Sequence, residues 1–190
     1  MAKSLFSIRD IVLCALFAAV LCVVSPFILP VGPVPLSLCN FAVMTAACVL
    51  GCARGTVSAA VFVAAGVIGL PVFGGGMGGI AHILAPTGGF ILSYIPSAAL
   101  SGAFSTLGRG RKHGFGITLT GCFLSVLLGY IIGTAWFAFS SGTPFSGELT
   151  RICVLPFLPF DAIKCVGAVL FSHLICSRLR IESSKNPRKV

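Results

Sequence analysis

Long apolar segments alternate with short polar segments, or with segments rich in glycine and proline, along almost the whole chain. A helix that spans a bilayer needs about 20 mostly apolar residues. The pattern predicts six such helices, the second of them short, at about residues 11–29, 38–50, 56–69, 88–107, 115–139 and 159–176. We therefore expect an all-α integral membrane protein, a single membrane domain over residues 1–190 with a basic tail at 177–190. The first segment is too long for a signal peptide and lacks an evident cleavage site, so we expect it to be retained as a helix.

The composition and the placement of charge support this interpretation. Hydrophobic residues make up 57% of the chain and charged residues 9%, with a mean hydropathy of +1.08, whereas a soluble domain carries about 25% charged residues. The net charge of +9 comes almost entirely from loops and chain ends, which is typical of the positive-inside rule and argues against nucleic-acid binding. Six helices place Arg54, residues 109–112 and the tail on one side, with Arg151 as the only loop cation on the other. We expect a multi-pass protein of the cell (plasma) membrane with both termini in the cytoplasm.

Two charged residues, Asp161 and Lys164, are the exception, because they lie within an apolar segment. An ionisable side chain within a membrane is costly unless it is paired or faces a cavity, so such a pair is a candidate functional site. Pro156 and Pro159 place Asp161 in the first turn of the last helix, near the outer face, where the helix dipole favours an acid. Lys164 lies one turn deeper on the same face. The alternative is that the two charges only neutralise each other.

A glycine-rich segment precedes the fourth predicted helix. Seven glycines lie between Gly74 and Gly89, flanked or interrupted by Pro71 and Pro86. Irregular backbone at membrane depth is tolerated only where it is buried in protein or lines a cavity. We therefore expect a re-entrant or lid-like outer loop, in which glycines let the backbone approach a ligand. His82 within it is either a packed structural residue or a ligand contact.

Further small and polar side chains complete the candidate set. Ala15 and Ala19 form a small-xxx-small face on the first helix, for internal packing or for docking onto another membrane subunit. Asn40 and Tyr94 place polar groups inside the second and fourth helices. A stripe of small residues on the fifth helix predicts tight helix packing; it consists of Gly121, Ser125, Gly129 and Gly133.

Several kinds of chemistry are poorly supported. The chain has no phosphate-loop, nucleophile-elbow or His-Glu-x-x-His motif. Most of its nine cysteines lie in apolar segments, where a thiol behaves as a small hydrophobic group, and none completes a zinc set. The acids do not form a proton relay in the membrane. We expect no cofactor and no structural metal, and a binding protein whose energy comes from elsewhere.

Three segments together resemble the BioY family of biotin transporters, the substrate-binding S components of energy-coupling factor (ECF) transporters. They are GLPVFGGGMGG (69–79), APTGGF (85–90) and PFLPFDAIK (156–164). The segment VPLSLCNFAV (34–43) resembles the second helix of the family, although Cys39 and Asn40 stand where Gln-Thr is expected. The resemblance covers about residues 10–176. It implies six helices around a biotin pocket open to the outside. It also implies two kinds of partner, a transmembrane coupling subunit that contacts the Ala15 and Ala19 face of the first helix and a pair of ATPases. Some members of the family work without these ATPases.

Biotin has a ureido ring, an apolar thioether bicycle and a carboxylate. Asp161 is suited to the ureido N–H groups, and Lys164 to the ureido oxygen or the carboxylate. The expected substrate contacts also include polar and backbone groups and an apolar wall. They are Asn40, Tyr94, Gly75, Gly78, Gly79, Phe73, Phe90 and Phe157, with Phe41 as a further aromatic candidate. The alternatives are the same architecture binding riboflavin or thiamine, a small membrane transferase that uses Asp161 and His82, and a purely structural membrane subunit.

Overall fold

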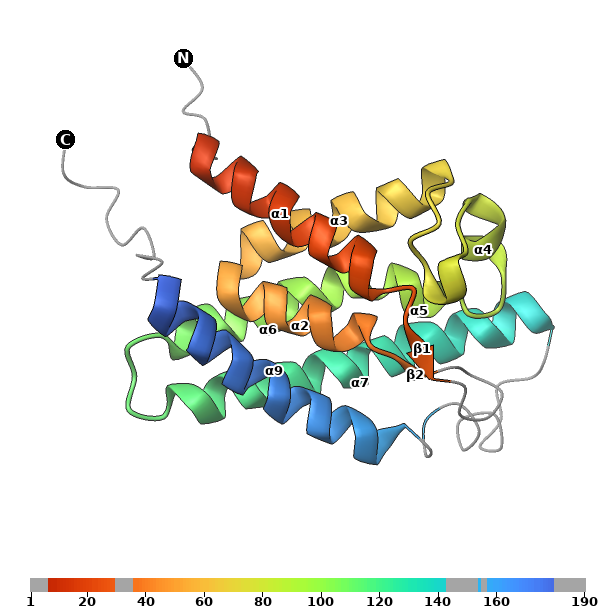
Figure 1. Cartoon of the computed structure of the whole chain (residues 1–190). Coiled ribbons are helices and arrows are strands. Elements are labelled where there is room, and N and C mark those ends of the chain that lie inside the picture. Colours follow the sequence, from red (N-terminus) through yellow and green to blue (C-terminus); the bar gives the residue numbers. More distant parts are fainter. Residues whose placement is uncertain (1–6, 30–35, 143–153, 155–156, 180–190) are drawn as a thin grey trace, which may run out of the picture.

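The structure, a computed structural model, is a bundle of helices (Figure 1) and describes residues 7–29, 36–142, 154 and 157–179. The predictions for Pro156, Arg151 and the tail from residue 180 onward lie outside the described residues. The helices are α1 (Ile8–Val24), α2 (Cys39–Leu50), α3 (Cys52–Ile68), η1 (Gly74–Gly76), α4 (Ile80–Leu84), α5 (Gly88–Leu92), α6 (Tyr94–Gly108), α7 (Gly114–Ser141) and α9 (Leu158–Leu179). Two short strands, β1 (Ile28–Leu29) and β2 (Leu36–Ser37), pair antiparallel between α1 and α2.

Three helical stretches in the described part of the chain are long and apolar enough to cross a membrane. They are Gly88–Gly108, Gly114–Ser141 and Leu158–Cys176. Two further apolar helices, Cys39–Leu50 and Cys52–Ile68, are shorter. The prediction of an all-α membrane protein is confirmed at this level.

Local chemistry explains where the helices depart from the predicted ranges. The first helix begins at Ile8, since the Asp10 carboxylate accepts the Ser7 N–H at 3.1 Å, and it ends at Val24, just before Pro26. The third helix begins at Cys52, four residues earlier than expected. Gly51 makes the whole turn from α2 to α3 at φ +86°, a conformation that favours glycine.

The fourth predicted helix is interrupted at Ser93, between α5 and α6. Pro96 has no N–H to donate to the carbonyl of Leu92, one turn back, and its ring crowds that carbonyl. At the interruption, the Ser93 hydroxyl donates to the backbone oxygen of Phe90 at 2.7 Å.

Helix α6 lies at the centre of the bundle and packs against α2, α3 and α7. The small-residue stripe on α7 faces α5 and α6, where the tight packing predicted for it is found. A Cβ added at Gly121 would lie 2.2 Å from Phe104 Cβ, and one at Gly133 would lie 2.3 Å from the ring of Phe90. Between these two glycines, the Ser97 hydroxyl donates to Ser125 O at 3.0 Å. The stripe therefore lets the helices approach more closely than larger side chains would allow.

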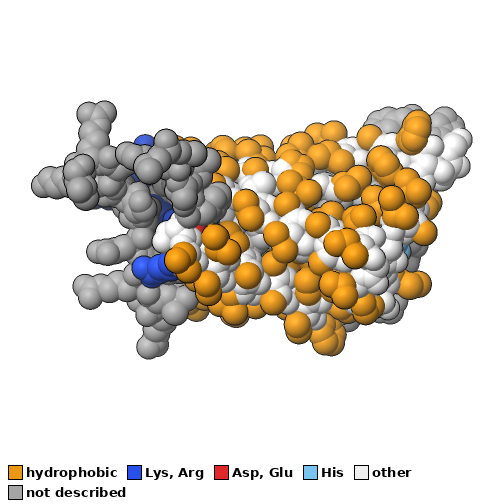
Figure 2. Space-filling view, turned by 90° about the horizontal axis from the view of Figure 1, so that it is seen from above, with side chains coloured by type: hydrophobic (Ala, Val, Ile, Leu, Met, Phe, Trp, Pro, Cys, Tyr) orange, Lys and Arg blue, Asp and Glu red, His pale blue; other side chains and the backbone are white. Residues whose placement is uncertain are grey.

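The buried interior contains two clusters of apolar side chains. Cysteines are among its smallest members, and the thiols of Cys48 and Cys122 lie 3.6 Å apart without a disulfide. Large apolar side chains are also exposed all along the outer helices. Figure 2 shows them covering the sides of the molecule, while Lys and Arg appear at one end. This distribution fits a protein surrounded by lipid.

One end of the bundle holds the start of α1, the end of α9, and the α2–α3 and α6–α7 turns (Figure 1). We call it the basic end. Here Arg54 of α3 forms an ion pair with Asp10 of α1 at 3.1 Å. The opposite end holds β1, β2 and α4 (Figure 1).

The glycine-rich segment is at this opposite end and is more regular than expected. Phe73 N donates to Met77 O at 2.8 Å, closing a turn around η1. The expectation of irregular backbone is wrong for Ile80–Leu84, which forms the five-residue helix α4. Gly79, at φ +91°, precedes this helix and gives the chain the conformation it needs to enter it.

Candidate ligand-binding site

A cavity of about 170 Å³ lies among the helices at the end opposite the basic end. Its wall is drawn from the α1–β1 connection, β2, α2, the glycine-rich segment, α5, α6, α7 and α9. Ligand sites in helical membrane proteins are commonly built in this way, from side chains that converge from several helices onto a mostly apolar space. We call it the ligand cavity.

Asp161 and Lys164 lie on its wall, both on α9. Lys164 Nζ is 3.0 Å from Asp161 Oδ1, and the Lys164 and Asp161 side chains are only 11% and 9% exposed. Helix α9 begins with Pro159 in its first turn, and the N–H of Asp161 bonds to Phe157 O at 2.8 Å. The spacing of three residues then places both side chains on one helix face.

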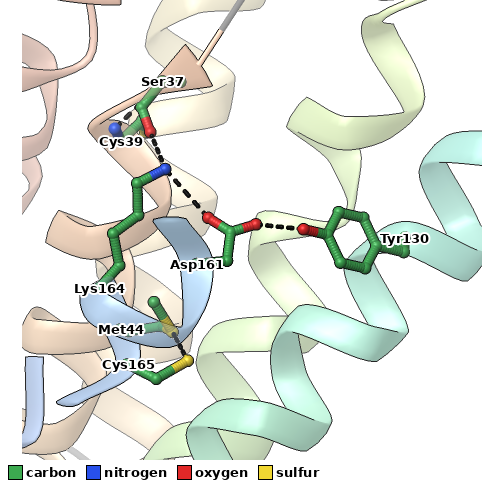
Figure 3. A network of polar contacts seen from close by, with 7 residues as sticks. All are labelled: Ser37, Cys39, Met44, Tyr130, Asp161, Lys164 and Cys165. Atoms are coloured by element: carbon green, nitrogen blue, oxygen red, sulfur yellow. Dashed lines mark hydrogen bonds and ion pairs between the residues drawn. The ribbon is translucent and has the colours of Figure 1, made fainter. Parts of the chain in front are cut away.

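The pair belongs to a larger network (Figure 3). Tyr130 of α7 donates its hydroxyl to Asp161 Oδ2 at 2.5 Å, and Lys164 Nζ donates to Ser37 O in β2 at 2.9 Å. The two charges therefore join α9 to α7 on one side and to the strand pair on the other.

The network leaves hydrogen-bonding capacity for a ligand. An ionised carboxylate has about four acceptor positions and an ammonium has three donors. The contacts described above use two acceptor positions of Asp161 and two donors of Lys164. Mutual neutralisation alone therefore does not saturate either group, and both lie on the wall of the ligand cavity.

The structure brings most of the predicted site residues to the cavity wall. Those present on it are Asn40, Phe73, Phe90, Tyr94, Phe157, Asp161 and Lys164. His82 also lines the cavity, and its ring stacks on Phe73 with centroids 5.7 Å apart. The imidazole is thus packed against an aromatic ring and placed at the cavity at the same time.

Gly75, Gly78 and Gly79 are not on the wall, whereas Gly74 is. A Cβ at Gly78 would meet the backbone oxygen of Leu70 at 2.2 Å, so this glycine is needed for the segment to fold back on itself. That these three glycines approach a ligand stays a prediction.

Phe41 is not on the wall either. Its ring meets Phe171 of α9 edge-on, with centroids 5.8 Å apart. A Cβ at Gly167 of α9 would lie 3.2 Å from the same ring. Phe41 therefore packs α2 against α9 outside the ligand cavity.

Several members of the wall were not among the predicted site residues. They are Ser25, Ile28, Ser37, Gly74, Thr87, Ile91, Ser93, Val126, Gly129 and Tyr130. Tyr130 could have been found, because the chain has only two tyrosines and both lie in apolar segments, where a buried hydroxyl needs a partner. Ser37 contributes its backbone oxygen to Lys164, and no side-chain pattern reveals such a contact.

Comparisons with known proteins identify the family of the chain. A family model described as "BioY family" matches residues 1–181.

The chain belongs to the BioY family.

Among its relatives is the biotin transporter BioY of Rhizobium etli, which is 35% identical over 179 residues and aligns over 89% of this chain and 94% of its own length. The biotin transporter BioY of Lactococcus lactis is 35% identical over 156 residues, which cover 80% of this chain and 79% of its own. A solved structure of the S-component for biotin from an ECF-type ABC transporter matches with a TM-score of 0.75 and 28% sequence identity, over 93% of both chains. The BioY resemblance seen in the sequence is thus confirmed.

Proposed function

We propose that this BioY-family chain takes up biotin across the cell membrane as the substrate-binding S component of an ECF-type transporter. It is a transporter subunit rather than an enzyme. The observation that carries the proposal is the ligand cavity, whose wall holds the Asp161–Lys164 pair with acceptor and donor positions to spare. Relatives named as biotin transporters and the S-component for biotin supply the identity of the ligand.

In the proposed complex the ureido ring of biotin lies against Asp161. The free carboxylate positions of Asp161 accept the ureido N–H groups, and the third donor of Lys164 binds the ureido oxygen or the biotin carboxylate. Such charge-assisted bonds contribute about 1.5–3 kcal/mol each. Asn40 of α2 and Tyr94 of α6 also line the cavity and provide further polar contacts.

The thioether bicycle is apolar and needs a dry surface. Phe73, Phe90 and Phe157 come from three separate segments and line the same cavity. Phe73 and Phe157 are themselves buried, so their rings are held in place by packing before a ligand arrives. A wall that is formed in advance lowers the entropic cost of binding.

We further propose six spans, formed by α1, α2, α3, α5 with α6, α7 and α9. Helices α2 and α3 are short for a bilayer of about 30 Å, and β1 and β2 extend the α1–α2 connection at the cavity end. The gathering of Lys and Arg at the basic end supports a cytoplasmic position for that end and for both termini. The ligand cavity then opens towards the outside.

The proposed partners are a transmembrane coupling subunit and a pair of ATPases, the energising module with which some members of the family dispense. Ala15 and Ala19 are exposed on α1, while Ala18 between them is only 4% exposed and packs inward. Small exposed side chains allow another helix to approach closely. This supports the docking interpretation of Ala15 and Ala19 over internal packing.

Competition binding tests the function. Purified protein in detergent is incubated with radiolabelled biotin and an excess of unlabelled biotin, riboflavin or thiamine. We expect saturable binding that only unlabelled biotin abolishes. Displacement by riboflavin or thiamine would assign the same architecture to another vitamin, and absence of saturable binding would leave the ligand assignment without support.

A further inference from the structure

A second cavity, of about 420 Å³, lies at the basic end of the bundle. It is enclosed by the α6–α7 turn, the first turns of α7 and the last part of α9. Arg109, Arg111, Lys112 and His173 line it. We call it the basic cavity. It lies at the opposite end of the bundle from the ligand cavity, and the transport mechanism proposed above assigns it no role.

The positive charge of the basic cavity is not balanced by the described part of the chain. Two acids, Asp10 and Asp161, fall within the described residues, and each forms an ion pair elsewhere, with Arg54 and Lys164. Arg111 and Lys112 are exposed at the rim. The cavity thus concentrates cations in a concave space, which favours an anionic ligand.

Arg109 is held in a fixed orientation. Its Nη2 donates to Cys48 O at 3.0 Å and also to Val49 O, at the C-terminal end of α2. The Ser105 hydroxyl donates to the same Cys48 carbonyl at 2.7 Å. A guanidinium has five N–H donors, and both bonds leave from one nitrogen, so the other nitrogens can donate to a further acceptor while Arg109 caps α2. This is a preorganised donor, of the kind that suits the oxygens of a phosphate.

The walls are amphipathic rather than purely charged. Phe115 is 40% exposed and lies against His173, with ring centroids 6.0 Å apart. On α9 the apolar side chain of Leu170, one turn before His173, is 50% exposed. Figure 2 shows the apolar surface beginning next to the basic end. A ligand with a phosphate head and an apolar body fits this arrangement better than a wholly polar acidic peptide does.

We propose that the basic cavity binds a phosphate group, supplied by the headgroup of an anionic phospholipid whose acyl chains lie along α7 and α9. Basic pockets between membrane helices at the cytoplasmic side are suited to anionic headgroups. The same N–H groups would also donate to the phosphate of a small soluble ester. The experiment separates these two sources of the phosphate.

The test compares two lipids with identical acyl chains, phosphatidylglycerol and phosphatidylcholine, by native mass spectrometry of the purified protein in detergent. Glycerol 3-phosphate is titrated separately by calorimetry. Arg111→Gln and Arg111→Gln/Lys112→Gln are the test variants. Arg9→Gln is the matched control, because Arg9 is an exposed arginine in the first turn of α1 and does not line the basic cavity. Biotin binding, which takes place at the other end, verifies that each variant is folded.

We expect the protein to retain phosphatidylglycerol at least fivefold better than phosphatidylcholine. Arg111→Gln reduces this preference about threefold and the double variant abolishes it, while Arg9→Gln changes it less than twofold. Binding of glycerol 3-phosphate with the same dependence on Arg111 would support the phosphate site with a soluble ester as its source.

Equal retention of the two lipids without glycerol 3-phosphate binding would overturn the proposal. So would an equal loss in Arg111→Gln and Arg9→Gln, since only overall charge would then matter. If neither phosphate compound binds and the double variant instead loses its association with a coupling subunit, the basic cavity is a protein contact and the proposal is wrong.

Discussion

Tyr130 of α7 donates its hydroxyl to Oδ2 of Asp161 on α9 at 2.5 Å, while Oδ1 of the same carboxylate faces Lys164 at 3.0 Å (Figure 3). One carboxylate thus has both oxygens engaged by side chains from two helices, and its remaining acceptor positions have defined directions. Tyr130 is therefore a positioning residue for the group that we propose to recognise biotin.

Replacing Tyr130 with phenylalanine removes this hydroxyl and keeps the ring. A hydrogen bond to an ionised carboxylate contributes about 1.5–3 kcal/mol, and its loss leaves Asp161 less well oriented, so we expect the dissociation constant of biotin to rise about tenfold. Equilibrium binding of radiolabelled biotin measures it. Thr120→Val is the control, because it removes an exposed hydroxyl of α7 that bonds only within its own helix, to Gly116 O. Equal affinity of Tyr130→Phe and the wild type would show that Asp161 needs no support from α7.

Removing one charge of the buried pair should affect stability as well as binding. Lys164→Met leaves Asp161 without its cation, and an uncompensated buried charge costs about 3–5 kcal/mol. We expect a lower melting temperature for this variant in detergent without biotin.

The double variant Asp161→Asn/Lys164→Met separates the two roles of the pair. It removes both charges, so we expect the melting temperature to recover most of the loss, while biotin affinity stays at least tenfold below the wild type. Recovery of biotin binding along with the melting temperature would mean that the pair only neutralises itself.

Close packing at Gly133 allows a test of the aromatic wall of the ligand cavity. A Cβ there would lie 2.3 Å from the ring of Phe90, which lines the ligand cavity. In Gly133→Ala the Phe90 ring must move, and we expect biotin affinity to fall severalfold. Gly116→Ala on the same helix adds a Cβ that has no neighbouring atom of the described residues within 4 Å and should leave affinity unchanged. Unaltered binding in Gly133→Ala would indicate that Phe90 does not contact the ligand.

The exposed alanines of α1 should matter for assembly and not for binding. Leucine at Ala15 and Ala19 enlarges a surface that we propose meets the coupling subunit. We expect Ala15→Leu/Ala19→Leu to lose at least tenfold in co-purification with the coupling subunit, with unchanged biotin affinity. Ala135→Leu alters an exposed alanine of α7 and serves as the control. An intact complex in the double variant would place the partner on another face.

The sequence alone predicts the charged pair and the aromatic wall well, for a physical reason. Charge inside an apolar segment is costly, so Asp161 and Lys164 stand out without any knowledge of the fold. The length of each apolar segment predicts most of the helix ranges, as for the fifth predicted helix, which the structure shows as Gly114–Ser141. Family resemblance adds the ligand, which the residue pattern leaves open.

The remaining contacts depend on three-dimensional arrangement and could not be derived. The bond from Lys164 to Ser37 O joins residues 127 positions apart through a backbone atom, which carries no side-chain signal. Gly78 is one of the glycines expected to approach a ligand, and the structure shows another reason for glycine there, since a Cβ would lie 2.2 Å from Leu70 O. Both roles favour glycine for the same steric reason, so composition cannot tell them apart.

Equilibrium binding of radiolabelled biotin to purified wild-type protein and to Asp161→Asn measures whether the Asp161 carboxylate recognises biotin. Asparagine keeps the size of the side chain but replaces one acceptor oxygen with a donor and removes the charge. We expect saturable binding to the wild type at a single site and at least a tenfold higher dissociation constant for Asp161→Asn. Equal affinities for the two proteins would show that Asp161 does not recognise biotin.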